Sequence, residues 1–149
     1  GNTGISLNIF RLSGIYGPGR SLVDRLHAGE NLVVVDRRNQ LFNRVHVFDI
    51  VGITYLAMLK NFKNEIFNVS DDNPASQVEV SEFAANLASF PPVKKVSLES
   101  NLISDMAKSF YLEEKKVSNK SVKRKLGYAF KFPSFYEGLK DIYENIIKV

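Results

Sequence analysis

The sequence predicts one globular domain that mixes strands and helices, of the α/β or α+β class. Short apolar, β-branched runs gather in the first half of the chain, and most of the segments with helical spacing lie in the second half; this order is typical of mixed folds. The length of 149 residues suits a single domain. With 44% hydrophobic and 24% charged residues, the chain has the composition of a protein with a buried core.

The first half contains four predicted strands, at 5–12, 32–36, 42–49 and 65–70. Each is short and either apolar or alternating. The glycine- and proline-rich segment 13–20 predicts a tight loop after the first strand. Apolar residues at helical spacing, with Gly29 behind them, predict a helix over 21–28. Asp49 is expected to cap a well-buried helix over 50–61, because this segment is apolar on most sides.

Helices dominate the rest of the chain. Ser81 is expected to cap a helix that Pro91 and Pro92 end, and a further helix is predicted within 98–112. Asn119 as N-cap and Gly127 after the last turn enclose a short helix. The segment 132–149 carries one apolar stripe and predicts a closing helix. The DDNPAS segment at 71–76 predicts a turn in which Asp side chains accept from the backbone, rather than a catalytic carboxylate pair.

Composition excludes several functional classes. The chain has no cysteine, so a disulfide framework, a thiolate metal site and a cysteine nucleophile are ruled out. His27 and His46 lie without metal-ligand spacing around them, so no zinc site is predicted. The apolar runs are too short to cross a bilayer, and no signal-like segment opens the chain. We therefore expect a protein of the reducing cytoplasm.

Positive charge is concentrated in the last third of the chain. The net charge is +4, and the segment 115–125 has six basic residues in eleven. With Tyr111, Tyr128 and Phe130 nearby as stacking surfaces, this segment is one candidate for nucleic-acid binding. The alternative is a solvated helix face.

Four segments, in order, resemble one family. They are RLSGIYGPGR at 11–20, NRVHVFDIV at 43–51, EIFNVSDD at 65–72 and KVSNKSVKRKLGYAFKFPSFYEGL at 116–139. Together they resemble the C-terminal half of an extended short-chain dehydrogenase/reductase, in the NAD-dependent epimerase/dehydratase branch with its atypical members. The resemblance implies an α/β fold in which the C-terminal strands of a Rossmann-type sheet join a small α/β substrate-binding subdomain. Residues 1–149 would form that part, without the cofactor-binding half.

The resemblance also implies site residues. Those expected beside the nicotinamide of NAD or NADP are Leu12, Ser13, Gly14 and Ile15. Those expected at the substrate are Tyr16, Arg20, Asn43 and Arg44. A guanidinium can clamp a phosphate or carboxylate through two parallel hydrogen bonds; the alternatives are an ordinary Gly-Pro turn at 17–19 and an exposed strand arginine at Arg44.

Two motifs of the family are missing. No Gly-x-x-Gly-x-x-Gly turn occurs in the chain, although that turn holds the cofactor pyrophosphate. The Tyr-x-x-x-Lys pattern occurs at Tyr111–Lys115 and Tyr136–Lys140, but the family's catalytic pair precedes the strand at Arg11, so both are rejected. We therefore expect no catalytic residue in the chain. It would be the substrate-binding portion of an NAD(P)-dependent nucleotide-sugar epimerase, dehydratase or reductase, inactive by itself; the alternative is a non-catalytic nucleotide-sugar-binding module.

The first strand predicts an interaction between chains. Its apolar residues Ile5, Leu7, Ile9 and Leu12 would lie in or beside a sheet whose neighbouring strands are missing. An uncovered apolar edge strand pairs readily with another chain. We therefore expect self-association through this strand, as a dimer or larger species.

Overall fold

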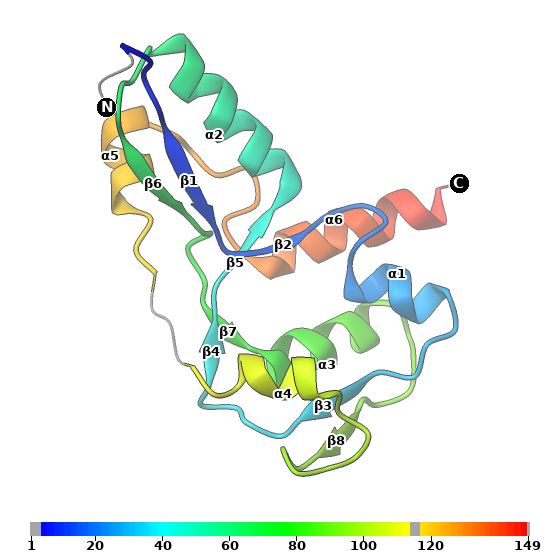
Figure 1. The fold of residues 1–149 in the computed structure, drawn as a ribbon. Helices are drawn as coiled ribbons and strands as arrows, with labels where there is room; N and C mark the ends of the chain where they lie inside the picture. Colours follow the sequence, from blue (N-terminus) through cyan, green and yellow to red (C-terminus); the bar gives the residue numbers. More distant parts are fainter. Residues whose placement is uncertain (1–3, 114–116, 149) are drawn as a thin grey trace.

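The computed structural model describes residues 4–113 and 117–148, and its strands form short pairs (Figure 1). Three pairs are parallel: β1 (Ile9–Leu12) with β6 (Ile66–Val69), β2 (Gly14–Tyr16) with β5 (Arg44–His46), and β3 (Val33–Val35) with β8 (Lys94–Val96). One pair is antiparallel: β4 (Leu41–Phe42) with β7 (Ala75–Ser76). The Ser13 amide donates to the Val69 carbonyl, and the Asp71 amide donates to the Arg44 carbonyl. These two bonds join the β1/β6 and β2/β5 pairs.

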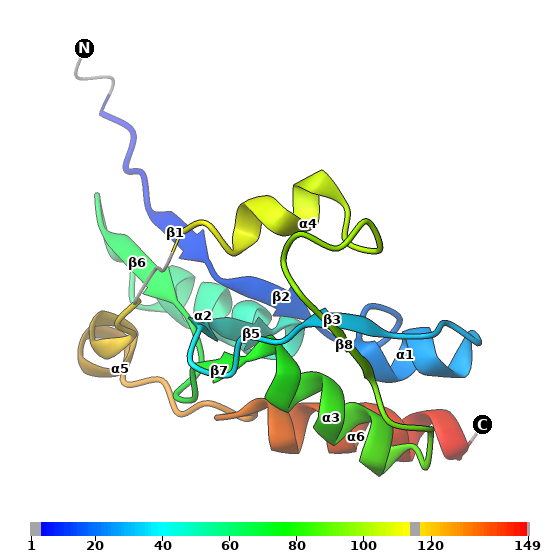
Figure 2. The same ribbon diagram turned by 90° about the horizontal axis from the view of Figure 1, so that it is seen from below.

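Helices surround these pairs. They are α1 (Leu22–His27), α2 (Val47–Leu59), α3 (Gln77–Leu87), α4 (Asp105–Phe110), α5 (Lys120–Leu126) and α6 (Phe135–Ile147). Helices α2 and α5 lie with β1 and β6 at one end of the molecule, whereas α3 and α6 run side by side at the other (Figures 1 and 2). No helix in the described part of the chain is long and apolar enough to cross a membrane.

Local signals predicted several elements correctly. The Ser21 side chain accepts from the Asp24 amide and starts α1, within the predicted helix. Gly127 follows α5 with a φ of 65°, a left-handed conformation that glycine adopts without strain. Asn119 is the N-cap residue as expected, but its side chain makes no capping bond. It donates instead to the Ser70 carbonyl at 3.0 Å and to Asp72 Oδ1 at 2.8 Å.

Three predicted boundaries are wrong. Helix α2 begins at Val47, because the His46 side chain accepts from the Phe48 amide; Asp49 therefore lies inside the first turn and does not cap it. Helix α3 begins after Ser76, whose side chain accepts from the Glu79 amide, rather than at Ser81. The expected loop at 13–20 contains strand β2, because its backbone pairs with β5.

Three further elements differ from expectation. Within the predicted helix at 98–112, only α4 is helical, and Ser104 caps it. Strand β8 was not predicted; its lysines and valine form a strand because β3 lies alongside. The strand expected at 5–12 is limited to β1.

Two apolar clusters form the interior. The pocket-side core joins α1, α3, α6 and β3 and consists of Tyr16, Val23, Leu26, Leu32, Val34, Ala75, Val78, Val80, Ala84, Ala85, Val93, Phe135, Leu139 and Ile142. The sheet-side core joins α2, α5, β5 and β6 and consists of Val45, Ile53, Ala57, Phe67, Val69, Val122 and Leu126. The β2/β5 pair lies between them, so residues of this pair can contact both.

Candidate functional site

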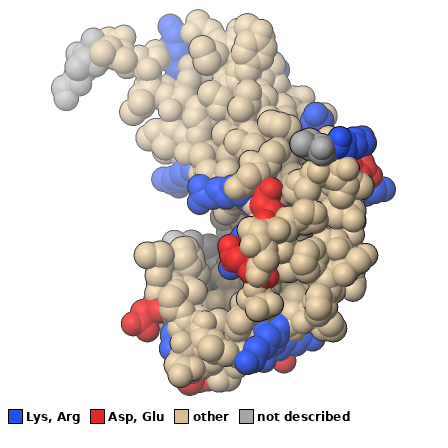
Figure 3. Space-filling model, turned by 90° about the vertical axis from the view of Figure 1, so that its right-hand side faces the viewer, with Lys and Arg blue, Asp and Glu red and all other residues tan. Residues whose placement is uncertain are grey.

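A hollow of about 920 Å³ opens beside the pocket-side core. Its walls come from β2, β5, α1, α3 and α4, with Phe135 and Leu139 of α6 at its base. Seen from the side in Figure 3, the surface is hollowed between the upper and lower parts of the molecule, and basic side chains lie along the upper rim. Segments far apart in the sequence thus meet around one space of ligand size.

Six of the eight residues proposed from the sequence line this hollow. They are Gly14, Ile15, Tyr16, Arg20, Asn43 and Arg44. Leu12 and Ser13 are not among the lining residues. Leu12 is 43% exposed, whereas the Ser13 hydroxyl is buried with no hydrogen-bond partner among the residues that the structure describes.

The hollow is positively charged. Three arginines line it, Arg20, Arg25 and Arg44, and no Asp or Glu does among the described residues. Arg25 pairs with Glu30 at 2.7 Å, with both side chains about half exposed. Exposed pairs of this kind contribute little free energy, so an anionic ligand can replace Glu30 beside Arg25 at little cost. Sequence reasoning did not single out Arg25, because a lone arginine on a short helix carries no pattern.

Arg44 is not an exposed strand arginine, and its guanidinium already donates hydrogen bonds to other parts of the protein. Its Nη1 donates to the carbonyls of Phe42 at 3.1 Å and Ala75 at 2.9 Å, and its Nη2 donates to Gln77 Oε1 at 2.6 Å. Burial lowers the pKa of its guanidinium, and Asp71 opposes this shift. Arg44 therefore ties the β4/β7 pair to β5 while contributing positive charge to the wall.

Tyr16 is oriented by its surroundings. Its ring is nearly buried, and its hydroxyl donates to the Ser134 carbonyl at 3.3 Å. A Cβ on Gly138 of α6 would overlap this hydroxyl, so glycine there makes room for the ring. Burial, reinforced by Asp71, raises the pKa of Tyr16 well above its usual range. The phenol therefore stays protonated and positions the wall of the hollow.

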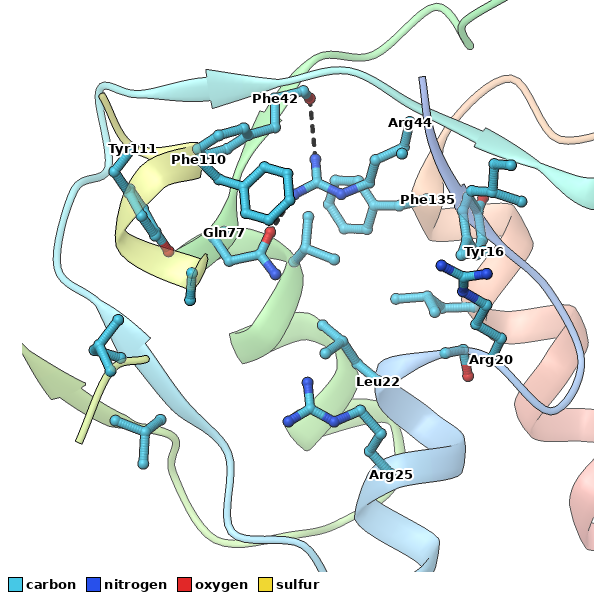
Figure 4. A pocket seen from close by; sticks show the side chains of 18 of the residues that line it. Tyr16, Arg20, Leu22, Arg25, Phe42, Arg44, Gln77, Phe110, Tyr111 and Phe135 are labelled. Atoms are coloured by element: carbon cyan, nitrogen blue, oxygen red, sulfur yellow. Dashed lines mark hydrogen bonds between the residues drawn. The ribbon is translucent and has the colours of Figure 1, made fainter. Parts of the chain in front are cut away.

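The opposite wall is aromatic and apolar. Phe42, Phe110 and Tyr111 lie together there, facing Arg20 and Arg25 across the space (Figure 4). The rings of Phe42 and Tyr111 pack edge to face, with 5.4 Å between their centroids. Sequence reasoning missed this wall, because the aromatic pair 110–111 reads as an ordinary part of a helix.

Two buried carboxylates lie behind the hollow. Asp49 accepts from the Tyr128 hydroxyl at 2.6 Å and from the amides of Lys131 and Phe132 at 2.8 and 3.0 Å; it holds the loop before α6. Asp71 Oδ1 accepts from the Asn73 amide at 3.0 Å, as the predicted turn requires. Its Oδ2 is buried without a partner among the described residues. Burial raises the pKa of Asp71 to about 7.

Gly14 lines the hollow at a point where two strands lie close together. A Cβ on Gly14 would lie 3.3 Å from the Asn43 carbonyl, so glycine allows β2 and β5 to pair closely here. The pyrophosphate, which backbone amides of a glycine turn would hold, finds no such turn in this sequence.

Comparison with known proteins gives structural matches only. No protein-family model and no curated protein matches the sequence. A conserved protein of unknown function from Silicibacter pomeroyi is 33% identical, with a TM-score of 0.89 over 96% of this chain and 50% of that one. UDP-glucose 4-epimerase from Thermotoga maritima, solved with UDP-glucose, is 22% identical, with a TM-score of 0.73 over 99% of this chain and 48% of that one.

A human epimerase family protein solved with NADPH is 19% identical, with a TM-score of 0.78 over 97% of this chain and 50% of that one. The chain thus spans about half the length of these structures. The matches confirm the predicted fold class: parallel strand pairs and helices arranged as in part of a Rossmann-type α/β protein. They include nucleotide-sugar epimerases and dehydratases, some solved with NAD.

Proposed function

We propose that this chain is the substrate-binding part of an NAD(P)-dependent nucleotide-sugar epimerase, dehydratase or reductase, and that the hollow binds the nucleotide sugar. One observation carries the proposal: three arginines and no carboxylates line a space of about 920 Å³ in a fold shared with such enzymes. A diphosphate is a dianion that guanidinium groups bind strongly. Tyr16 and Asn43 complete the proposed substrate wall.

We further propose that residues outside this sequence supply the cofactor half. Leu12, Ser13, Gly14 and Ile15 would then lie beside the nicotinamide end. The missing glycine turn supports this division, because hydride transfer requires a cofactor held rigidly against its substrate. By itself the chain would bind substrate without turnover. A nucleotide-sugar-binding module without redox chemistry is the second candidate, and the same hollow supports it.

Titration calorimetry with UDP-glucose tests the proposal. We expect binding by the chain, and a loss of about a hundredfold or more in affinity when Arg20→Ala and Arg25→Ala are combined, because each removes a charge-assisted hydrogen bond worth about 1.5–3 kcal/mol. The matched control is Arg124→Ala, an exposed arginine of α5 that does not line the hollow. Undetectable binding, or equal losses in the control and the double variant, would contradict the proposal.

The nucleic-acid candidate has weaker support. Lys125 pairs with Glu65 at 2.6 Å, and Lys123 pairs with Asp72 at 2.5 Å, so half of the described basic side chains at 117–125 are neutralised. Lys115 and Lys116 lie outside the described residues. These pairs favour a solvated helix face over a nucleic-acid surface.

We also propose self-association through β1. This strand pairs with β6 on one side, and the apolar side chains of Ile5, Leu7, Ile9 and Leu12 are exposed. Parallel sheets are normally covered on both faces, so this uncovered strand favours pairing with a second copy. Light scattering should show a dimer or larger species; a monodisperse monomer would contradict the proposal.

A further inference from the structure

The orientation of the Gln77 side-chain amide is fixed by its partner. Gln77 is the first residue of α3 and lines the hollow. Its Oε1 accepts a hydrogen bond from Arg44 Nη2 at 2.6 Å. A guanidinium only donates hydrogen bonds, so the oxygen and not the nitrogen of the amide must face it. The Nε2 group, which only donates, is therefore turned away from Arg44.

This Nε2 group faces the hollow. Figure 4 shows the nitrogen of the Gln77 amide on the side of the open space, while the oxygen lies toward Arg44. Within the part of the chain that the structure describes, Nε2 donates to no other group and is not one of the buried polar atoms. A ligand in the hollow can therefore supply the acceptor that this donor lacks.

The charge of Arg44 is not neutralised by a neighbouring carboxylate. Its partners are the carbonyls of Phe42 and Ala75 and the amide oxygen of Gln77, all of them uncharged. Asp71 attracts Arg44 electrostatically but does not line the hollow, and Arg44 forms no ion pair with any described residue. A guanidinium has five N–H groups, so Arg44 can donate to a further acceptor. A largely desolvated cation without a paired charge favours an anionic partner.

The pair Arg44–Gln77 lies on a different wall from the other two arginines of the hollow. Arg20 and Arg25 come from the β2–α1 connection and from α1, whereas Arg44 comes from β5 and Gln77 from α3 (Figure 4). Positive charge on two walls of one hollow favours a ligand that carries two separate anionic groups.

We propose that Arg44 and Gln77 bind a carboxylate of the ligand, so that the substrate is a nucleotide-linked sugar acid and Gln77 is a specificity-determining residue. A carboxylate only accepts hydrogen bonds, and its two oxygens suit one donor from Gln77 and one from Arg44. The hydroxymethyl group of a neutral sugar would leave the charge of Arg44 unpaired. The inference rests on the proposed function and deepens it, because it adds a second anionic group to the proposed substrate.

The test compares two ligands that differ at one group. UDP-glucuronate has a carboxylate where UDP-glucose has a hydroxymethyl group, and titration calorimetry measures Kd for each. The ratio of the two Kd values is the readout, because effects on the shared diphosphate cancel in it. Gln77→Glu keeps an acceptor for Arg44 but replaces the donor by a carboxylate. The matched control is Asn86→Asp, the same amide-to-acid change at an exposed position of α3 that does not line the hollow. Thermal melts check that the variants fold.

We expect the parent to prefer UDP-glucuronate by about tenfold or more, the effect of one charge-assisted hydrogen bond. Gln77→Glu should abolish this preference, and Asn86→Asp should retain it. If the parent binds both ligands equally, or if Gln77→Glu keeps the preference for UDP-glucuronate, the inference is overturned and the proposed function stands. If the parent binds neither ligand, both are overturned.

Discussion

The two cores of this molecule differ in how completely they cover their apolar surface. In the pocket-side core, helices α1, α3 and α6 pack on one another, and Val23, Val78 and Ala84 are fully buried. The sheet-side core is equally tight inside, where Ile53 and Phe67 are fully buried. Its outer surface is different: helix α2 also carries a second row of large apolar side chains that is exposed.

That second row lies on one face of the helix. It consists of Phe48, Val51, Tyr55, Met58 and Leu59, spaced three or four residues apart. No charged residue occurs between Asp49 and Lys60. A helix that is apolar all round is typical of a buried position, so this face of α2 is an apolar surface that the described residues leave uncovered. The proposed ligand site therefore adjoins the pocket-side core, and the surface proposed for contact between copies lies in the sheet-side region.

The largest effect is expected when the hydrogen bonds that join the pocket-side and sheet-side regions are removed. Asp49 of α2 holds three donors from the segment that leads into α6. Asp49→Ala leaves these donors unpaired in a buried site, and we expect a loss of about 3 kcal/mol or more in the free energy of unfolding. Urea denaturation measures it. Glu144→Ala, which removes an exposed carboxylate paired at 4.0 Å, is the control and should change stability by less than about 0.5 kcal/mol.

Asp71 lies at the boundary between the two regions, where it follows β6 and lies close to Arg44 and Tyr16. Its carboxyl group should make the stability of the fold depend on pH. Its folded-state pKa of about 7 exceeds the ordinary value of 3.8. The folded state therefore holds a proton that the unfolded state releases, and stability falls as pH rises from about 4 to about 7. Asp72 and Asp49 reinforce this shift, and Arg44 opposes it.

Asp71→Asn should remove this loss. We expect the variant to match the parent near pH 4 and to exceed it above pH 7 by an amount on the order of 4 kcal/mol, measured by urea denaturation across this range. His46, whose pKa burial lowers, acts in the opposite direction in acid, but its contribution is common to both proteins and cancels. Parallel pH profiles for the two would show that Asp71 does not titrate in this range.

The smallest effect on stability is expected on the outer face of α2. Val51→Lys and Met58→Lys place charges on positions that are 62% and 74% exposed. The free energy of unfolding should therefore change by less than about 0.5 kcal/mol. If this face is part of a contact between copies, both variants should lower the mass measured by light scattering. The control is Lys60→Ala, beside the same helix. An unchanged mass in all variants would limit the contact to β1.

The elements that short-range patterns specify were largely predictable, because caps and periodicity act within one turn or strand. Ser21, Ser134 and Gly127 mark helix ends by their own side chain or conformation. The errors at Asp49 and Ser81 arose where a second capping residue lay a few positions earlier, and only the backbone path decided between them. The resemblance placed six of eight proposed site residues around one hollow, although Arg25 and Phe110 carry no local signature.

What the sequence by itself determined is the fold class and the apolar excess of the segment 47–59, with Arg20 and Arg44 as candidate site residues. What only the tertiary structure decided is how polar groups are used. Arg44 donates to carbonyls 2 and 31 residues away and to a side chain 33 residues away, and Asp49 accepts from donors about 80 residues away. A buried polar group is stable only with partners, and those partners come together only when the chain is folded.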